Sequence, residues 1–267
     1  MKNFLKYINS IPFRFTMKHY QVFGDSKSHL KDNALVSVES WDELREKHPH
    51  FSVSSNRQEW LRSVELKVTK DGQDNGLIKR AEDIVNLLKK ENIKSVFSTG
   101  VGGAGLEYNI KKQMSEVNIY CSEYSQKNVD TLNKVFFEAG EIVTFDIIKG
   151  DWSMIKNTYL QNSSTSLLMY RLDAGFTDSE WRNIFESIYD SGVERIIYIP
   201  TTLLTAFSIF NRKKREFLWH KNKEQVSFAG YLRTKKEFES FWEGLYEKDD
   251  MVFGGLKGFY LKKIQKY

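Results

Sequence analysis

A glycine-rich run directly after an apolar segment constrains the fold of this chain more than any other feature. Residues 95–99 read Ser-Val-Phe-Ser-Thr, and glycines follow at positions 100, 102, 103 and 105. Glycine has no side chain, so the backbone can turn sharply off a strand there and approach a ligand closely. We therefore predict a strand over 95–99, a loop at its end and a helix after the loop. The same run also fits a tight strand-to-helix turn in any α/β protein, where glycine serves packing alone.

A carboxylate ends the next apolar run. Residues 117–122 predict a second strand, and Glu123 follows it, eighteen residues after Gly105. An acid at this place in a nucleotide-binding sheet accepts hydrogen bonds from ribose hydroxyls. The loop and Glu123 together predict a cradle for a nucleoside cofactor. Residues 100–109 include no lysine or arginine, which favours a cofactor without phosphate groups but does not exclude a dinucleotide, whose pyrophosphate can rest on backbone amides.

Strand-like and helix-like segments alternate from Gly76 to the end of the chain. Apolar residues at helical spacing predict helices over 78–88 and 129–136, and the pairs Thr177/Glu180 and Thr234/Glu237 have the spacing of a capping box. This order predicts a Rossmann-like, doubly wound, mostly parallel sheet that a terminal antiparallel hairpin closes. The further strands are expected at 142–147, 166–172, 195–199, 251–253 and 258–264.

The N-terminal quarter of the chain does not repeat this unit. Ser40 with Glu43, and Ser55 with Gln58, have the spacing of helix starts. We therefore expect a helical N-terminal cap over residues 1–75 and a separate cofactor-binding domain over 76–267.

Composition narrows the class of protein. The net charge of +5 over 267 residues is mild, so nucleic acid is not indicated as a partner. The sequence has no run of apolar residues long enough to span a bilayer and no signal-peptide pattern, and its single cysteine, Cys121, falls in an expected buried strand. We expect a cytoplasmic protein. The five histidines do not have metal-ligand spacing, and no metal is assigned.

Residues 78–264 resemble the class I S-adenosylmethionine-dependent methyltransferases, which have a seven-stranded sheet. The resemblance implies S-adenosylmethionine as cofactor, with the loop against its methionine and adenosine parts, Glu123 on the ribose, Asp151 on the adenine amino group and Trp152 on the adenine ring. It also places Asp173, after the fourth strand, near the transferred methyl group as a catalytic residue. The cofactor-binding residues that it implies are Ser98, Thr99, Gly100, Gly102, Gly103, Gly105, Glu123, Tyr124, Asp151 and Trp152.

One position departs from the family pattern. The family commonly has an acid two residues before the first glycine, where it contacts the amino group of the cofactor, and this chain has Ser98 there. Glu107 is close in sequence and is a possible substitute. We interpret it instead as a solvated carboxylate that complements the positive end of a helix.

The acceptor is less constrained than the cofactor. A small-molecule or sugar-like acceptor methylated at oxygen is the leading interpretation, and a general base would then come from Asp173, Asp178, His19, His220 or Tyr170. The basic cluster at 211–215, with Lys221 and Lys223, is either a solvated surface or a clamp for an anionic acceptor such as a glycan. The apolar residues 201–210 before it are expected to be buried, with an interfacial contact as the alternative.

Two other functions share the same features. The spacing of the glycines also fits a nicotinamide-dependent oxidoreductase. A non-catalytic cofactor-binding or scaffold protein of the same fold is the third interpretation, because Ser98 replaces an acid and no base stands out. The oligomeric state is left open.

Overall fold

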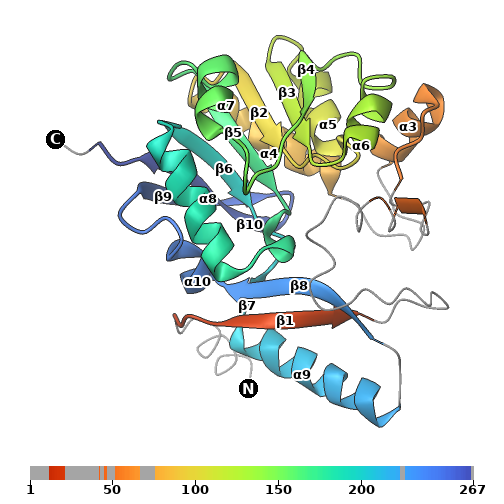
Figure 1. Ribbon diagram of the computed structural model, residues 1–267, viewed down its shortest axis with the longest axis vertical. Coiled ribbons are helices and arrows are strands. Elements are labelled where there is room, and N and C mark those ends of the chain that lie inside the picture. The colour runs from red at the N-terminus through yellow and green to blue at the C-terminus, as the bar shows by residue number, and fades with distance from the viewer. Residues whose placement is uncertain are drawn as a thin grey trace.

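The strands of the described residues form two sheets. The computed structural model describes residues 12–21, 42, 45–46, 52–66, 76–222 and 226–265. Figure 1 shows a large sheet flanked by helices and, beyond one end of its strands, a small sheet covered by a single long helix.

The large sheet has seven strands, and the expected mostly parallel sheet with a terminal hairpin is confirmed. Five neighbouring strands are parallel, and β10 is antiparallel to both of its neighbours. From one edge to the other the order is β4 (Glu141–Thr144), β3 (Asn118–Glu123), β2 (Ser95–Thr99), β5 (Thr165–Tyr170), β6 (Arg195–Ile199), β10 (Leu256–Lys263) and β9 (Tyr246–Phe253).

Helices cover both faces of this sheet. Successive residues of a strand point to opposite faces, and accordingly Val96 and Phe97 of β2 belong to two different apolar clusters. The first cluster includes residues of α3 (Arg57–Val64), α4 (Leu77–Lys90), α5 (Gly105–Gln113) and α6 (Gln126–Leu132). The second includes residues of α7 (Trp152–Tyr159), α8 (Asp178–Asp190) and α10 (Lys235–Glu239). The predicted capping box of α8 is present, with Thr177 as N-cap and Glu180 as its partner.

The small sheet was not expected from the sequence. It pairs β1 (Thr16–Gln21) with β8 (Ser227–Thr234) antiparallel, and β8 with the short β7 (Leu203–Leu204) parallel. The long helix α9 (Ala206–Lys221) lies on its outer side (Figure 1). Most of this unit is therefore an insertion between β6 and β9, and the N-terminal segment adds one strand to it.

The N-terminal region is thus not purely helical. Residues 16–21 form a strand because β8 offers them a partner, whereas α3 is a helix as expected, with Asn56 rather than Ser55 as its N-cap. The other expected helix start, at Ser40 and Glu43, lies outside the described residues. The domain boundary between residues 75 and 76 stays a prediction.

The small sheet adjoins the end of the large sheet at which the parallel strands finish. The contact is made by β8 and η3 (Asp173–Gly175), the turn that follows β5. The approach is close, since a Cβ atom at Gly230 would lie 2.2 Å from the carbonyl oxygen of Ala174. Arg233, fully buried, donates to the carbonyl oxygens of Asp173 and Phe176 and forms an ion pair with Asp178 (Nε to Oδ1, 2.7 Å). These bonds fix the small sheet to the loops at that end of the large sheet.

Candidate cofactor site

The glycine loop and Glu123 lie against each other. Gly100 and Gly102 have positive φ angles of 65° and 55°, a conformation that glycine adopts without strain. The backbone N–H of Gly100 donates to the carbonyl oxygen of Ser122 (2.8 Å), and that of Gly102 donates to Oε2 of Glu123 (2.8 Å). The left-handed turns of the loop thus hold a backbone amide on the carboxylate that ends β3.

The loop is packed at its two ends and open in the middle. A Cβ atom at Gly100 would lie 2.3 Å from Cδ2 of Leu172, and one at Gly105 would lie 3.3 Å from Cδ1 of Leu77. A Cβ at Gly102 or at Gly103 would meet no atom within 4 Å. The glycines at the ends therefore serve packing, while the middle two border open space next to Glu123.

An arginine from the N-terminal segment also reaches Glu123. Nη2 of Arg45 lies 3.0 Å from Oε1 of Glu123, and Glu123 is 6% exposed. Arg45 also lies 3.5 Å from Asp42, and the hydroxyl of Ser125, which caps α6, donates to the same Asp42 oxygen (2.7 Å). A residue far away in sequence thus orients the carboxylate, and no local pattern in the sequence indicates it. Tyr124, directly after β3, is half-buried.

Ser98 and Thr99 point into the structure. The hydroxyl of Thr99 accepts from that of Ser122 (3.0 Å), which ties the ends of β2 and β3 together. The hydroxyl of Ser98 donates to Oε1 of Glu107 (2.6 Å). Glu107 is 2% exposed, so the expectation of a solvated carboxylate was wrong: the helix turns this side chain toward the sheet. Burial raises the pKa of Glu107 to about 7.

This raised pKa predicts a pH-dependent stability. The folded protein holds the Glu107 proton more tightly than the unfolded chain, whose pKa is 4.5, so the stabilisation is present below pH 4.5 and is lost as pH rises to about 7. We expect urea unfolding at pH 5 and pH 8 to show that the free energy of unfolding changes less favourably over this range in the wild type than in Glu107→Gln, by about 2.5 kcal/mol. His19, whose pKa burial lowers to about 4, acts in the opposite direction but equally in both proteins. Equal pH dependence of the two proteins would contradict the assignment.

Asp151 and Trp152 begin α7. Oδ1 of Asp151 accepts from the backbone N–H groups of Ser153 (2.8 Å) and Met154 (3.2 Å), as an N-cap does, and the residue is exposed. The Trp152 ring is 3% exposed, packs edge-on against Phe145 and donates to the carbonyl oxygen of Ile147. Its ring therefore belongs to the core, and a contact of either residue with adenine stays a prediction.

Asp173 is fully buried rather than directed at open space. Oδ1 accepts from the backbone N–H of Thr201 (2.6 Å), and Oδ2 has no hydrogen-bond partner among the described residues. Burial raises the pKa of this carboxyl. In this arrangement Asp173 joins the loops after β5 and β6, and its contact with a methyl acceptor stays a prediction.

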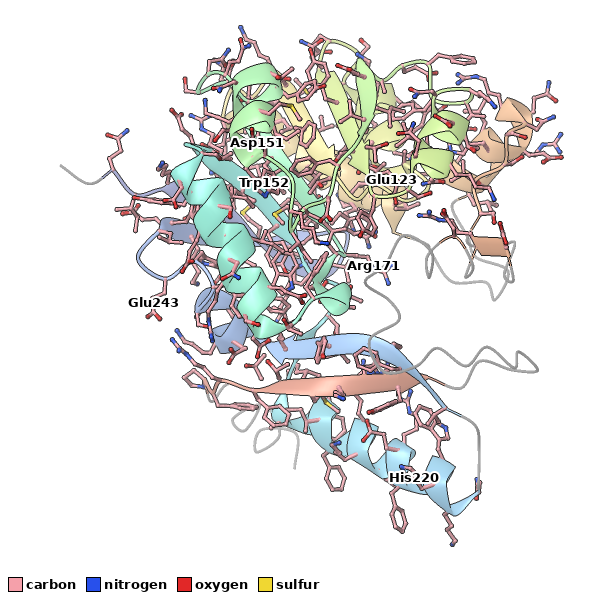
Figure 2. All side chains as sticks on the ribbon, in the orientation of Figure 1. Glu123, Asp151, Trp152, Arg171, His220 and Glu243 are labelled. Atoms are coloured by element: carbon pink, nitrogen blue, oxygen red, sulfur yellow. The ribbon has the colours of Figure 1, made fainter. Side chains whose placement is uncertain are left out.

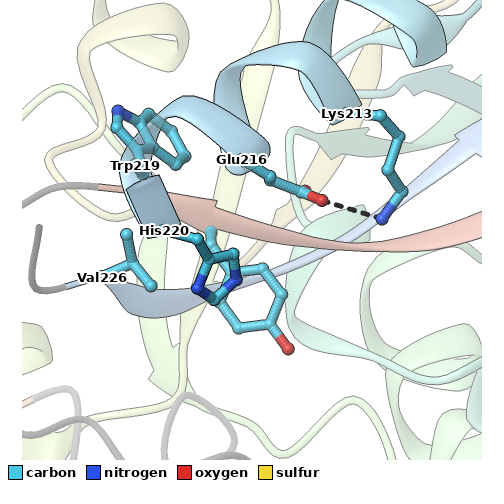
Figure 3. Close-up of a pocket in the computed structure, with 6 residues that line it drawn as sticks. Lys213, Glu216, Trp219, His220 and Val226 are labelled. Carbon is cyan, nitrogen blue, oxygen red and sulfur yellow. Dashed lines mark hydrogen bonds and ion pairs between the residues drawn. The ribbon is translucent and has the colours of Figure 1, made fainter. Parts of the chain in front are cut away.

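The other candidate bases are dispersed. The hydroxyl of Tyr170, at the end of β5, accepts from Arg80 (2.8 Å), and Asp178 is paired with Arg233. His19 and His220 belong to the small sheet and its helix. His220 borders a cavity of about 370 Å³ formed with Tyr20, Lys213, Glu216, Trp219 and Val226 (Figure 3). None of these elements carries the glycine loop.

Arg171 is a candidate that the sequence analysis did not identify. It follows β5 directly, is exposed, and has a φ of 56°, which is rare for a residue with a side chain. Such strained positions concentrate at functional sites. Its neighbour Leu172 contacts Gly100. Figure 2 shows Arg171 and Glu123 at the same end of the large sheet, where the parallel strands finish. In the sequence, Arg171 is only an arginine directly after an expected strand, and this pattern is too common to indicate a functional residue.

Comparison with known proteins identifies the fold. No protein-family model matches the sequence, and no curated protein sequence matches it. Among solved structures, magnesium protoporphyrin IX methyltransferase (ChlM) from Synechocystis PCC 6803, with bound SAH (S-adenosylhomocysteine), aligns with a TM-score of 0.53 and 11% identity over 86% of this chain and 100% of that one. The mitomycin 7-O-methyltransferase MmcR aligns with a TM-score of 0.51 and 12% identity over 88% of this chain and 74% of that one. The chain has the class I methyltransferase fold.

The chain spans only part of some of the structures that it resembles. The chain spans 55% of the pyocyanin biosynthetic protein PhzM, at a TM-score of 0.49 and 13% identity over 70% of this chain. At these identities the likeness concerns the fold alone.

Proposed function

We propose that this protein is an S-adenosylmethionine-dependent methyltransferase that acts on a small-molecule acceptor at oxygen. The observation that carries the proposal is the contact of the Gly102 amide with Glu123 beside a loop that is open at residues 102 and 103. ChlM, which binds SAH, and MmcR, which by its name methylates oxygen, support it through the shared fold.

The residues present fit an adenosyl group. A carboxylate has about four lone-pair positions, and Gly102 and Arg45 take one on each oxygen of Glu123. Positions are left for two ribose hydroxyls, while the two existing bonds hold the carboxylate in one orientation. The bare backbone at Gly102 and Gly103 lets a ligand approach the loop closely. The exposed Asp151, with Oδ1 already used as a cap, offers Oδ2 to an adenine amino group.

The chemistry requires alignment of donor and acceptor, and an oxygen acceptor must also lose its proton to a base. S-adenosylmethionine supplies an electrophilic methyl group on a sulfonium. The chain contributes by holding donor and acceptor in line and by excluding water, which together supply most of the rate enhancement in such displacements. We assign Asp173 as a positioning residue. Its bond to the Thr201 amide joins the loops after β5 and β6, at the end of the large sheet where the acceptor would bind.

Thermal denaturation with ligands tests this function. A ligand at a hundredfold excess over its Kd stabilises the native state by about 2.7 kcal/mol, or about 5 °C in Tm for a chain of this size. We expect S-adenosylhomocysteine to give this shift and NAD to give none. A shift with NAD alone would instead favour the oxidoreductase, and no shift with either would contradict both. Transfer of a radiolabelled methyl group from S-adenosylmethionine to extract components would then distinguish a methyltransferase from a non-catalytic scaffold protein.

Arg171 gives the acceptor a chemical class. Arg171 is exposed at the end of the large sheet that carries the glycine loop. Its guanidinium would favour an acceptor with a carboxylate or phosphate group. We expect Arg171→Gln to raise KM for anionic acceptors about tenfold and to leave KM for neutral acceptors and the Kd of S-adenosylhomocysteine unchanged. An equal rise in KM for neutral and anionic acceptors would contradict this role.

A further inference from the structure

Helix α9 exposes an unusual number of large apolar side chains. It has no buried residue, although one side of it packs on the small sheet. Its exposed apolar residues are Phe207 (46% exposed), Phe210 (66%), Phe217 (68%) and Leu218 (43%). At 3.6 residues per turn these four positions fall on one side of the helix. The expectation that residues 201–210 are buried was therefore wrong for Phe207 and Phe210.

Basic side chains lie among and beside these apolar residues. Lys214 and Lys221 fall on the same side of the helix as the phenylalanines, and Arg215 flanks that side; all three are exposed. Glu216 is the single acidic residue of α9, and it pairs with Lys213 (2.8 Å), as Figure 3 shows. Figure 1 places α9 at the outer boundary of the molecule, away from the large sheet. Its outer side is thus both apolar and positively charged.

Charge complementarity selects the occupant of this surface. Two copies of α9 would bring like charges together, which opposes self-association through this helix. Nucleic acid would satisfy the lysines but would offer no apolar environment to phenylalanines on a helix face. An anionic bilayer satisfies both, because aromatic and leucine side chains enter the boundary of the acyl chains while lysine and arginine contact the headgroups. No helix among the described residues is long and apolar enough to cross a membrane.

We propose that the outer side of α9 docks this protein on the surface of an anionic phospholipid bilayer. The contact is peripheral, with Phe207, Phe210, Phe217 and Leu218 in the interface and Lys214, Arg215 and Lys221 at the headgroups. This surface is separate from the candidate cofactor site, since α9 contains neither the glycine loop nor Glu123.

Vesicle flotation tests the proposal. The full chain should float with phosphatidylcholine vesicles that contain phosphatidylglycerol and not with phosphatidylcholine vesicles alone, and high salt should weaken the binding. The double variant Phe210→Ser/Phe217→Ser should bind the anionic vesicles at least about tenfold more weakly than the wild type. The double variant Lys214→Glu/Lys221→Glu should lose binding to a similar extent. Val252→Ser, which removes an apolar side chain of 58% exposure on β9, serves as the matched control and should bind as the wild type does.

Other outcomes would overturn it. Absence of binding to anionic vesicles does so, and so does equal binding by the wild type and the double phenylalanine variant. Salt-sensitive binding of a labelled oligonucleotide, without vesicle binding, would assign the surface to nucleic acid. A wild-type dimer in sedimentation that the phenylalanine variant loses, again without vesicle binding, would assign it to a second copy.

Discussion

Replacing Glu123 by glutamine is expected to weaken binding of S-adenosylhomocysteine about a hundredfold. Hydrogen bonds to a charged acceptor contribute about 1.5–3 kcal/mol each, and two ribose hydroxyls would bond to this carboxylate. Glutamine has nearly the same shape, and its oxygen can still accept from the Gly102 amide, whereas its NH2 group cannot accept from Arg45. The loop contact should therefore be kept while the charge and the pair with Arg45 are lost. Isothermal titration calorimetry measures the two Kd values directly.

The control for this variant is the same substitution at Glu141. This residue is at the start of β4, where its carboxylate accepts from the hydroxyl of Tyr159 (2.8 Å). Glu141→Gln should bind S-adenosylhomocysteine as the wild type does. Because Glu123 also pairs with Arg45, urea unfolding of both variants is needed to show that they remain folded. A change of less than about threefold in the Kd of folded Glu123→Gln would contradict the proposed ribose contact.

Arg233→Met should lower the free energy of unfolding by about 3–5 kcal/mol. The guanidinium is fully buried and holds Asp178 and the carbonyl oxygens of Asp173 and Phe176. Methionine fills part of the volume but leaves those oxygens without a donor, and each buried group without a partner costs about 1–3 kcal/mol. Urea unfolding monitored by tryptophan fluorescence and by circular dichroism measures the change.

Arg182→Met is the matched control for the buried arginine. The Arg182 side chain is 50% exposed and lies 3.6 Å from Glu237, a geometry in which an ion pair contributes at most about 1 kcal/mol. The two arginines thus differ in burial while the substitution is the same. If Arg233→Met cost no more than Arg182→Met, the small sheet would not depend on Arg233 for its attachment.

The large sheet could be predicted from the sequence because its signals are local. Strands at 95–99 and 195–199 have the bounds expected, and the Thr177 capping box begins α8 as expected. Alternation of short apolar runs with helical spacing is enough to indicate a parallel sheet with helices on both faces. The small sheet could not be found in this way, since the partners Thr16 and Arg233 are more than two hundred residues apart.

The candidate site shows the same division. The sequence indicates the loop and Glu123, because glycine spacing and a strand-end acid are local patterns. Arg45 reaches Glu123 only through the fold, and the burial of Glu107 depends on how α5 packs on the sheet. The strained backbone of Arg171 is likewise a property of the folded chain.

A crystal structure of the protein with S-adenosylhomocysteine tests the central claim most directly. The account predicts density for the ligand beside Gly102 and Gly103, with both ribose hydroxyls within hydrogen-bond distance of the Glu123 carboxylate. Ligand bound elsewhere, or a ribose turned away from Glu123, would contradict it.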